Sequence, residues 1–300
     1  MIYLSIFELF YAFSMVWSPS KIYTKYSGFI ISMDRSVTGV GYEIFNVLYC
    51  TMFGTSLANF GVHFIYRFLA LRGNKEWTSS NPSKIVIWIA SPLVLGAVYT
   101  VAIVHFWGPN ESTEQFMRLK VLNNSPNSTL NDLSFIGFNI YPEDENGVQY
   151  ANWKGIVGVT AVSSLITFSF NIMLYFGIKC YTELNKLTGI STVSKDYQSI
   201  QNQLFLALVM QTIIPLVFMH LPSTVIAALC FLNSVPEVLG QITAIFVSLY
   251  PVLDPLPNIF IIKSYRIALY RAICCRKGAE LEPMSTNSFV NRNVSTVLES

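Results

Sequence analysis

The fold is decided by the stretch from residue 201 to residue 271, which begins QNQLFLALVMQTIIPLVFMHLPSTV (201–225) and ends YPVLDPLPNIFIIKSYRIALYR (250–271). Two apolar runs within it are each long enough to cross a bilayer, and a short polar segment, 233–237, joins them. The first run contains Pro215 and Pro222. Proline bends a helix by removing a backbone hydrogen bond, which a membrane helix tolerates when its neighbours satisfy the freed carbonyl. The stretch therefore predicts a bent membrane helix, a tight turn and a second membrane helix.

The second run is interrupted near its end by Pro251, Asp254, Pro255 and Pro257. An aspartate at membrane depth is costly, so it usually marks a function or a buried polar network. After Ile262 the sequence becomes the basic, amphipathic KSYRIALYRAICCRK, which we expect to lie along the membrane surface. A bent helix, a short turn, an interrupted helix and a basic surface helix are together typical of a seven-helix receptor.

The composition indicates an integral membrane protein. Of 300 residues, 52% are hydrophobic and 12% are charged, whereas soluble domains average about 25% charged residues. The net charge is +2, and the basic residues lie at helix ends, which argues against a nucleic-acid partner. The five cysteines and three histidines are dispersed, so neither a metal site nor a cofactor is expected. We find no catalytic motif and predict that the protein is not an enzyme.

Six segments are apolar and long enough to predict an all-α, polytopic membrane helix bundle of the rhodopsin-like type. A receptor bundle over 1–272 precedes a disordered cytoplasmic tail at 273–300. The expected spans are 1–17, 42–70, 85–107, 154–178, 204–232 and 238–262.

The sidedness follows from the basic residues, which concentrate on the cytoplasmic side of membrane proteins. The segments 67–84, 179–203 and 263–300 contain 13 Lys and Arg residues, against 6 in the opposite set. The loop 108–152 is then outside, and it holds three glycosylation sequons, at Asn110, Asn123 and Asn127. Six spans with a cytoplasmic C-terminus place the N-terminus in the cytoplasm, which matches the second to seventh helices of a receptor whose first helix is missing.

The chain resembles a known family, the Str-class serpentine chemoreceptors of nematodes, which includes an odorant receptor for diacetyl. The residues that carry the resemblance are MIYLSIFELFYA (1–12), SLANFGVHFIYRFLAL (56–71), KDYQSIQNQLFLALVMQTIIPLVFMHLPSTV (195–225) and YPVLDPLPNIFIIKSYRIAL (250–269). The resemblance implies a multi-pass, G-protein-coupled olfactory receptor in the plasma membrane of chemosensory neuron cilia. Its implied partners are a heterotrimeric G protein, a small and often volatile odorant, and the lipid bilayer.

Two positions are expected to act in G-protein coupling. Arg67 occupies the place of the arginine in the receptor Asp-Arg-Tyr motif, although no acid is adjacent; the alternative is an arginine that reaches lipid headgroups. Asp254, Pro255 and Asn258 resemble the Asn-Pro-x-x-Tyr element of the seventh helix, and with Pro215 they form the expected switch; the alternative is a structural kink.

An odorant pocket is expected among the outer halves of the third, fifth, sixth and seventh helices. His220 donates there to a ligand, or else it is a core histidine bonded to a carbonyl freed by Pro222. The predicted lining residues are Tyr42, Phe45, Tyr49, Trp153, Phe218, His220, Thr224, Gln241 and Phe246.

Cysteines give two further expectations. Cys274 and Cys275 follow the basic surface helix and are predicted palmitoylation sites, the alternative being free thiols. The loop 108–152 contains no cysteine, so Cys50 cannot form the disulfide that fixes this loop in many receptors. The loop must therefore be ordered in another way or remain mobile.

Two other functions are alternatives to a receptor. A small-solute transporter or channel would show internal repeats and paired broken helices, and the chain has one broken region. A truncated, non-signalling receptor remnant is the other alternative.

Overall fold

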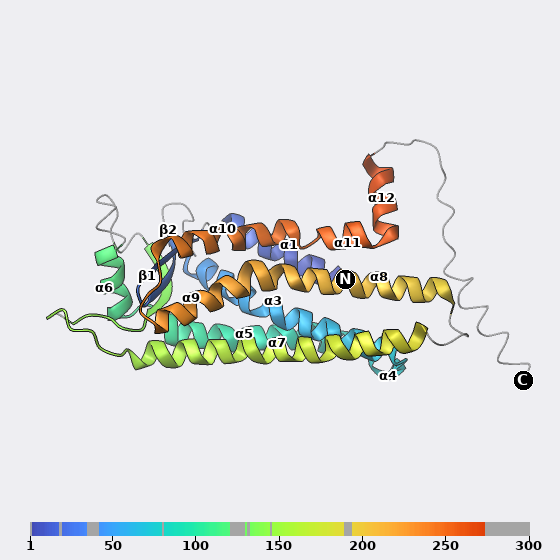
Figure 1. The fold of residues 1–300 in the computed structure, drawn as a ribbon, viewed down its shortest axis with the longest axis horizontal. Coiled ribbons are helices and arrows are strands. Elements are labelled where there is room, and N and C mark those ends of the chain that lie inside the picture. The colour runs from blue at the N-terminus through green and yellow to red at the C-terminus, as the bar shows by residue number, and fades with distance from the viewer. Residues whose placement is uncertain are drawn as a thin grey trace, which may run out of the picture.

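The computed structural model describes residues 2–17, 20–34, 42–79, 81–120, 130, 133–144, 146–188 and 194–273. It is an elongated bundle of helices, with a small β-sheet and helix α6 at one end (Figure 1). Helix α12 lies across the bundle direction at the other end. We call these the sheet end and the α12 end.

In the part of the chain that the structure describes, six rods of helix form the bundle, and two of them are broken. The first four are α1 (Ile2–Trp17), α3 (Tyr42–Leu71), α5 (Pro82–Trp107) and α7 (Trp153–Thr188). The fifth rod consists of α8 (Lys195–Pro215), the π-helix η3 (Leu216–His220) and α9 (Leu221–Phe231). The sixth consists of α10 (Glu237–Leu253) and α11 (Leu256–Ile261). The short helices are α4 (Lys75–Thr78), α6 (Glu111–Lys120) and α12 (Lys263–Ile273).

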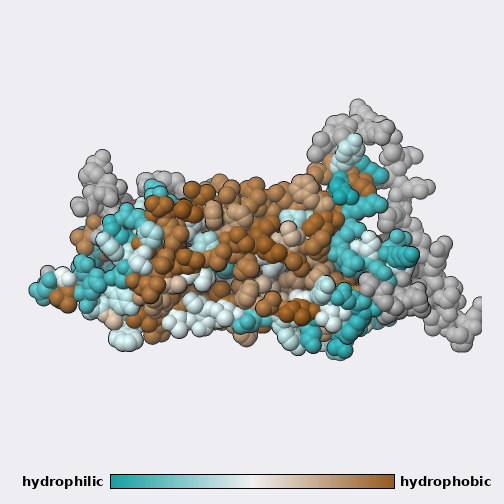
Figure 2. All heavy atoms as spheres, in the orientation of Figure 1, coloured by the Kyte–Doolittle hydropathy of each residue, from teal (hydrophilic) through white to brown (hydrophobic). Residues whose placement is uncertain are grey.

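On the face drawn in Figure 2, hydrophobic residues cover most of the middle of the bundle, and hydrophilic residues gather at its two ends. Within the described residues, four helices are long and apolar enough to cross a membrane: 82–107, 153–187, 195–231 and 237–261. Helix α1 is apolar but shorter. Helix α3 packs against several other elements and carries buried polar side chains, which lower its mean hydropathy: Asn46, Thr55, Ser56 and Asn59. The predicted class, a helical membrane bundle, is confirmed.

In helix α1 the spacing of the buried residues determines which face of the helix packs against the bundle. Leu4, Phe7, Glu8 and Tyr11 recur at helical spacing and are buried. The side chains on the opposite face are exposed apolar groups that suit contact with lipid: Ile6, Leu9, Phe10, Phe13 and Val16.

The sheet end holds an antiparallel sheet in the order β1 (Lys21–Lys25), β2 (Gly28–Asp34) and β3 (Leu133–Asn139). Lys25 pairs with Gly28, which leaves Tyr26 and Ser27 as a two-residue turn, with Tyr26 at φ 54°. Strand β3 joins from the 108–152 loop, with Ile31 opposite Ile136. Both segments lie between predicted membrane spans, at 18–41 and 108–152, where the sequence predicts loops. Strand pairing therefore orders the 133–139 part of the 108–152 loop without a disulfide.

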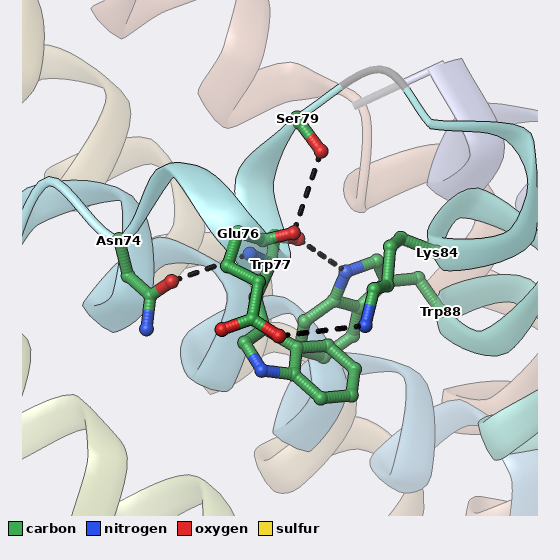
Figure 3. A network of polar contacts seen from close by, with 6 residues as sticks. All are labelled: Asn74, Glu76, Trp77, Ser79, Lys84 and Trp88. Carbon is green, nitrogen blue, oxygen red and sulfur yellow. Dashed lines mark hydrogen bonds and ion pairs between the residues drawn. The ribbon is translucent and has the colours of Figure 1, made fainter.

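The connection between α3 and α5 is also ordered (Figure 3). The Trp88 indole N–H donates to the carbonyl of Trp77 at 3.0 Å, and the Lys84 amine lies 3.9 Å from the centre of the Trp77 ring. Asn74 caps α4 by accepting from the Trp77 backbone N–H at 3.3 Å. These contacts hold α4 against the start of α5 at the α12 end.

Candidate functional site

A cavity of about 140 Å³ lies between the helices and the sheet. It is close in size to the ~150 Å³ apolar cavity that accommodates benzene in an engineered protein. Its walls come from α3, α5, α7, η3, α9 and α10, and from all three strands. The lining residues are Ile22, Phe29, Ile31, Tyr49, Cys50, Phe53, Tyr99, Ile103, Trp107, Phe138, Val159, Val162, Ser163, Ile166, Thr167, His220, Ser223, Thr224, Ile226, Ala227, Thr243 and Val247.

The cavity is mainly aromatic and aliphatic. None of the described residues that line it is Asp, Glu, Lys or Arg. Several of its hydroxyl groups are already engaged: Ser223 and Thr224 donate to backbone carbonyls one turn earlier, at 2.8 and 2.7 Å. The arrangement suits a small, uncharged molecule that makes few hydrogen bonds.

His220 is the polar residue at the broken helix. It ends the π-helix that follows Pro215, and its side chain is 3% exposed. Its Nε2 lies 3.4 Å from the Ser56 hydroxyl, and its ring packs 4.8 Å from that of Phe53. Among the described residues Nδ1 has no hydrogen-bond partner. This differs from a histidine bonded to a carbonyl freed by Pro222, and it leaves one ring nitrogen for a ligand.

The alternation of strand β2 explains how the sheet contributes. Phe29 and Ile31 point into the cavity, while Ile30 between them is fully buried on the other face. There Ile30 packs in a cluster with Phe116 and Met117 of α6. The sheet therefore forms a roof over the cavity, and α6 covers the roof.

The structure brings three of the nine predicted lining residues to the cavity: Tyr49, His220 and Thr224. Phe218 and Phe246 instead stack on each other, with ring centroids 5.4 Å apart. Trp153, at the start of α7, is 71% exposed. Phe45 is half-buried and Gln241 is exposed, and neither lines the cavity. The side chain of Tyr42 lies outside the described residues.

Sequence reasoning missed the roof residues Ile22, Phe29, Ile31 and Phe138 and the α5 residues Tyr99, Ile103 and Trp107. The strands carried only a weak signal, because Phe29, Ile30 and Ile31 form a short continuous apolar run that does not alternate with polar residues. The three α5 residues are spaced four apart and therefore share one helix face, which is the face that the structure buries. Their spacing was the signal available in the sequence.

Arg67 crosses between two rods at the α12 end. One of its terminal nitrogens donates to the backbone carbonyl of Gln201 at 2.5 Å and to the Gln201 side-chain oxygen at 3.1 Å. This links the end of α3 to the start of α8. Among the described residues Arg67 forms no ion pair. We call this contact the Arg67 strap.

The break between α10 and α11 is polar and buried. Asp254 is fully buried, its backbone carbonyl accepts from Gln211 at 3.4 Å, and its carboxyl group lies against that of Glu8 from α1. Asn258, one turn later, is 8% exposed, and its backbone carbonyl accepts from the backbone N–H of Ile262 at 3.2 Å. Two ionised carboxylates would repel each other in this apolar setting, so the pair favours a state in which at least one carboxyl group is protonated.

The predicted modification sites are only partly described. Asn110 is half-buried at the start of α6, where its Oδ1 accepts from Ser112 at 2.7 Å and its amide donates to the Gly108 carbonyl at 3.1 Å. Asn123, Asn127, Cys274 and Cys275 lie outside the described residues.

A membrane helix bundle with two proline-broken rods, an apolar cavity near one end and an arginine strap at the other defines a serpentine receptor. The family model for the Str class, described as a serpentine type 7TM GPCR chemoreceptor, matches residues 1–270. This chain belongs to that family, which is generally non-enzymatic.

Similar proteins agree. The chain is 34% identical to G-protein coupled receptor str-217 of Caenorhabditis elegans, over 98% of this chain and 86% of that protein. It is 30% identical to serpentine receptor class r-10 of Caenorhabditis briggsae, over 99% of this chain and 86% of that protein. It is 23% identical to G-protein coupled receptor str-33 of C. elegans, over 88% of this chain and 77% of that protein.

Proposed function

We propose that this protein is a chemosensory receptor that binds a small molecule in the cavity and activates a heterotrimeric G protein at the α12 end. The observation that carries the proposal is the uncharged cavity of about 140 Å³ beside the π-helix of the broken α8–η3–α9 rod. The excess of basic residues at the α12 end supports a cytoplasmic position for that end. In this proposal the receptor lies in the plasma membrane of a chemosensory cilium, and its sheet end faces the outside of the cell.

The broken rod connects the two ends in this mechanism. Its η3 and α9 parts contribute His220, Ser223 and Thr224 to the cavity wall, and its α8 part carries Gln201 of the Arg67 strap. A ligand that packs better against one arrangement of η3 shifts the rod toward that arrangement. Movement of α8 away from α3 then breaks the strap and opens a G-protein site beside Arg67. Asp254 and Asn258 form the second flexible point, in the neighbouring rod.

Two adjacent alanines provide a matched test. Ala227 lines the cavity, whereas Ala228 is exposed on the lipid-facing side of α9. We expect Ala227→Phe to fill the cavity and abolish the response to an activating odorant in a G-protein dissociation assay. Ala228→Phe is expected to respond like the unmodified chain at equal surface expression. A full response from the Ala227→Phe variant would refute the cavity as the ligand site.

A further inference from the structure

The roof blocks the direct path from the sheet end to the cavity. Phe29 and Ile31 line the cavity on one face of the sheet. On the other face Ile30, Phe116 and Met117 form a second buried layer, each at most 6% exposed. A molecule arriving from the sheet end would have to separate both layers.

The roof is also fastened to the bundle. Tyr26 and Val235 exchange two backbone hydrogen bonds, of 2.9 and 3.0 Å, between the β1–β2 turn and the α9–α10 connection. The Thr24 hydroxyl donates to the Pro236 carbonyl at 3.0 Å and accepts from the Gly240 backbone N–H at 3.0 Å. Opening the roof would break these bonds together.

A hollow on the side of the bundle offers another path. It is lined by Val159, Thr160, Ser163, Ser164, Thr167, Phe168 and Asn171 of α7 and by Phe231 of α9. Val159, Ser163 and Thr167 line the cavity as well, so the two spaces share a wall. Within the described residues α7 packs closely on α3, α5 and α8, and α9 is not among its close neighbours.

The shared wall carries two polar side chains, Ser163 and Thr167, although α7 is apolar and long enough to cross a membrane. Thr160 and Ser164 satisfy their hydroxyls by donating to carbonyls one turn earlier, at 2.8 and 2.7 Å. The hydroxyls of Ser163 and Thr167 have no such bond among the described residues. They line both spaces, and the cavity is also lined by His220, whose buried Nδ1 likewise lacks a partner among the described residues. A polar group crossing from the hollow would therefore find hydrogen-bonding groups along its path.

We propose that ligands enter the cavity from the bilayer, between α7 and α9 and past Ser163 and Thr167, and not through the roof. This inference rests on the proposed function for its ligand, and it specifies the ligand's class. The ligand is a small, uncharged organic molecule that dissolves in the membrane and carries about one hydrogen-bonding group. A charged molecule is excluded because neither the bilayer nor the cavity wall offers it a counter-charge.

Cys50 allows a test that needs no known ligand, because it is a free cysteine in the cavity wall. The full chain is reconstituted in lipid vesicles and treated with N-ethylmaleimide, or with a maleimide that carries a sulfonate. Labelling of the Cys50 peptide is followed by mass spectrometry. The buried Cys180 and Cys230, which do not line the cavity, are internal references. We expect the neutral reagent to label Cys50 at least fivefold faster than the charged one.

Variants of the hollow separate the two routes. Ser164 and Phe168 line the hollow but not the cavity, so Ser164→Phe should slow Cys50 labelling several-fold and Phe168→Ala should accelerate it. Leu174→Phe, on an exposed part of α7 outside the hollow, should leave the rate unchanged. Thr24→Val, which loosens the roof, should also leave it unchanged.

Three results would overturn the inference: equal labelling by the charged reagent, faster labelling in Thr24→Val with no effect of Ser164→Phe, or no labelling of Cys50 by either reagent. The labelling involves no G protein. Failure of the route is therefore distinguishable from failure of the proposed function, which is judged by the signalling of the Ala227→Phe variant.

Discussion

Arg67 and Gln201 form a contact at the scale of single residues that joins two separate rods. The guanidinium donates to both the backbone and the side chain of Gln201. A hydrogen bond that involves a charged group contributes about 1.5–3 kcal/mol when its geometry is good. The strap is therefore strong enough to influence the balance between a closed and an open α12 end.

We predict that Gln201→Ala raises ligand-independent signalling. The substitution removes the bond of 3.1 Å but keeps Arg67 and its bond to the backbone. A loss of about 1 kcal/mol corresponds to a several-fold rise in the open population. Basal G-protein activation at matched surface expression is the measurement. Asn202→Ala, at an exposed neighbouring position, is the control, and equal basal activity in the two variants would contradict the role of the strap.

The Glu8–Asp254 pair gives a second prediction at this scale. Asp254→Asn keeps a hydrogen-bonding partner for Glu8 and should change the melting temperature of the purified protein little. Asp254→Leu replaces the polar neighbour of the buried Glu8 carboxyl by an apolar side chain and should cost about 1–3 kcal/mol. Thermal unfolding in detergent compares the two variants. An equal loss of stability in both would show that the Glu8 carboxyl does not depend on a polar neighbour at position 254.

At the scale of elements, the roof depends on how β1 joins the α9–α10 connection. Two kinds of contact act there. Thr24 is 3% exposed and makes two hydrogen bonds of 3.0 Å. Lys25 and Glu237 form an ion pair at the surface, and the hydrogen bond with the Glu237 carboxylate raises the pKa of the Lys25 amine. Exposed ion pairs are screened by water, so the buried threonine should matter more.

We predict that Thr24→Val lowers stability more than Lys25→Ala does. Valine has the shape of threonine but leaves the buried Gly240 N–H without its partner, at a cost of about 1–3 kcal/mol. Melting temperatures of both variants in the same detergent provide the comparison. A larger loss in Lys25→Ala would mean that the surface ion pair, and not Thr24, fastens the roof.

At the scale of the whole molecule, the feature to decide is which end of the bundle faces the cytoplasm. Hydrophilic residues gather at both ends of the bundle, so the hydropathy of the structure does not distinguish them. The Lys and Arg count favours a cytoplasmic α12 end. The sequons lie in the segment that forms α6 and β3 at the opposite end.

We predict that a tag at the C-terminus is reached only after cells are permeabilised, and that the 108–152 loop carries N-linked glycans. Removal of Asn123 and Asn127 should reduce the glycan mass. Asn110→Gln should reduce it less, since the Asn110 amide is engaged at the start of α6. A C-terminal tag that is accessible on intact cells would invert the orientation and place the cavity on the cytoplasmic side.

The sequence by itself determined the class of the molecule and the positions of its breaks. Apolar runs long enough to cross a bilayer must become helices, because lipid offers no hydrogen bonds to the backbone. Pro215, Asp254 and Pro255 interrupt those helices for local reasons that depend only on the chain nearby. The motifs around these residues identified the family as well.

Only the tertiary structure decided the cavity and its roof. Strand β2 pairs with β3, which lies about a hundred residues later in the chain, and such a long-range register is not encoded in either segment alone. The same holds for the cavity wall, where each apolar residue looks like ordinary helix packing until its neighbours are known. Tyr49, His220 and Thr224 were predicted from their helices. Phe29, Ile31 and Phe138 reach the cavity because the folded sheet carries them there.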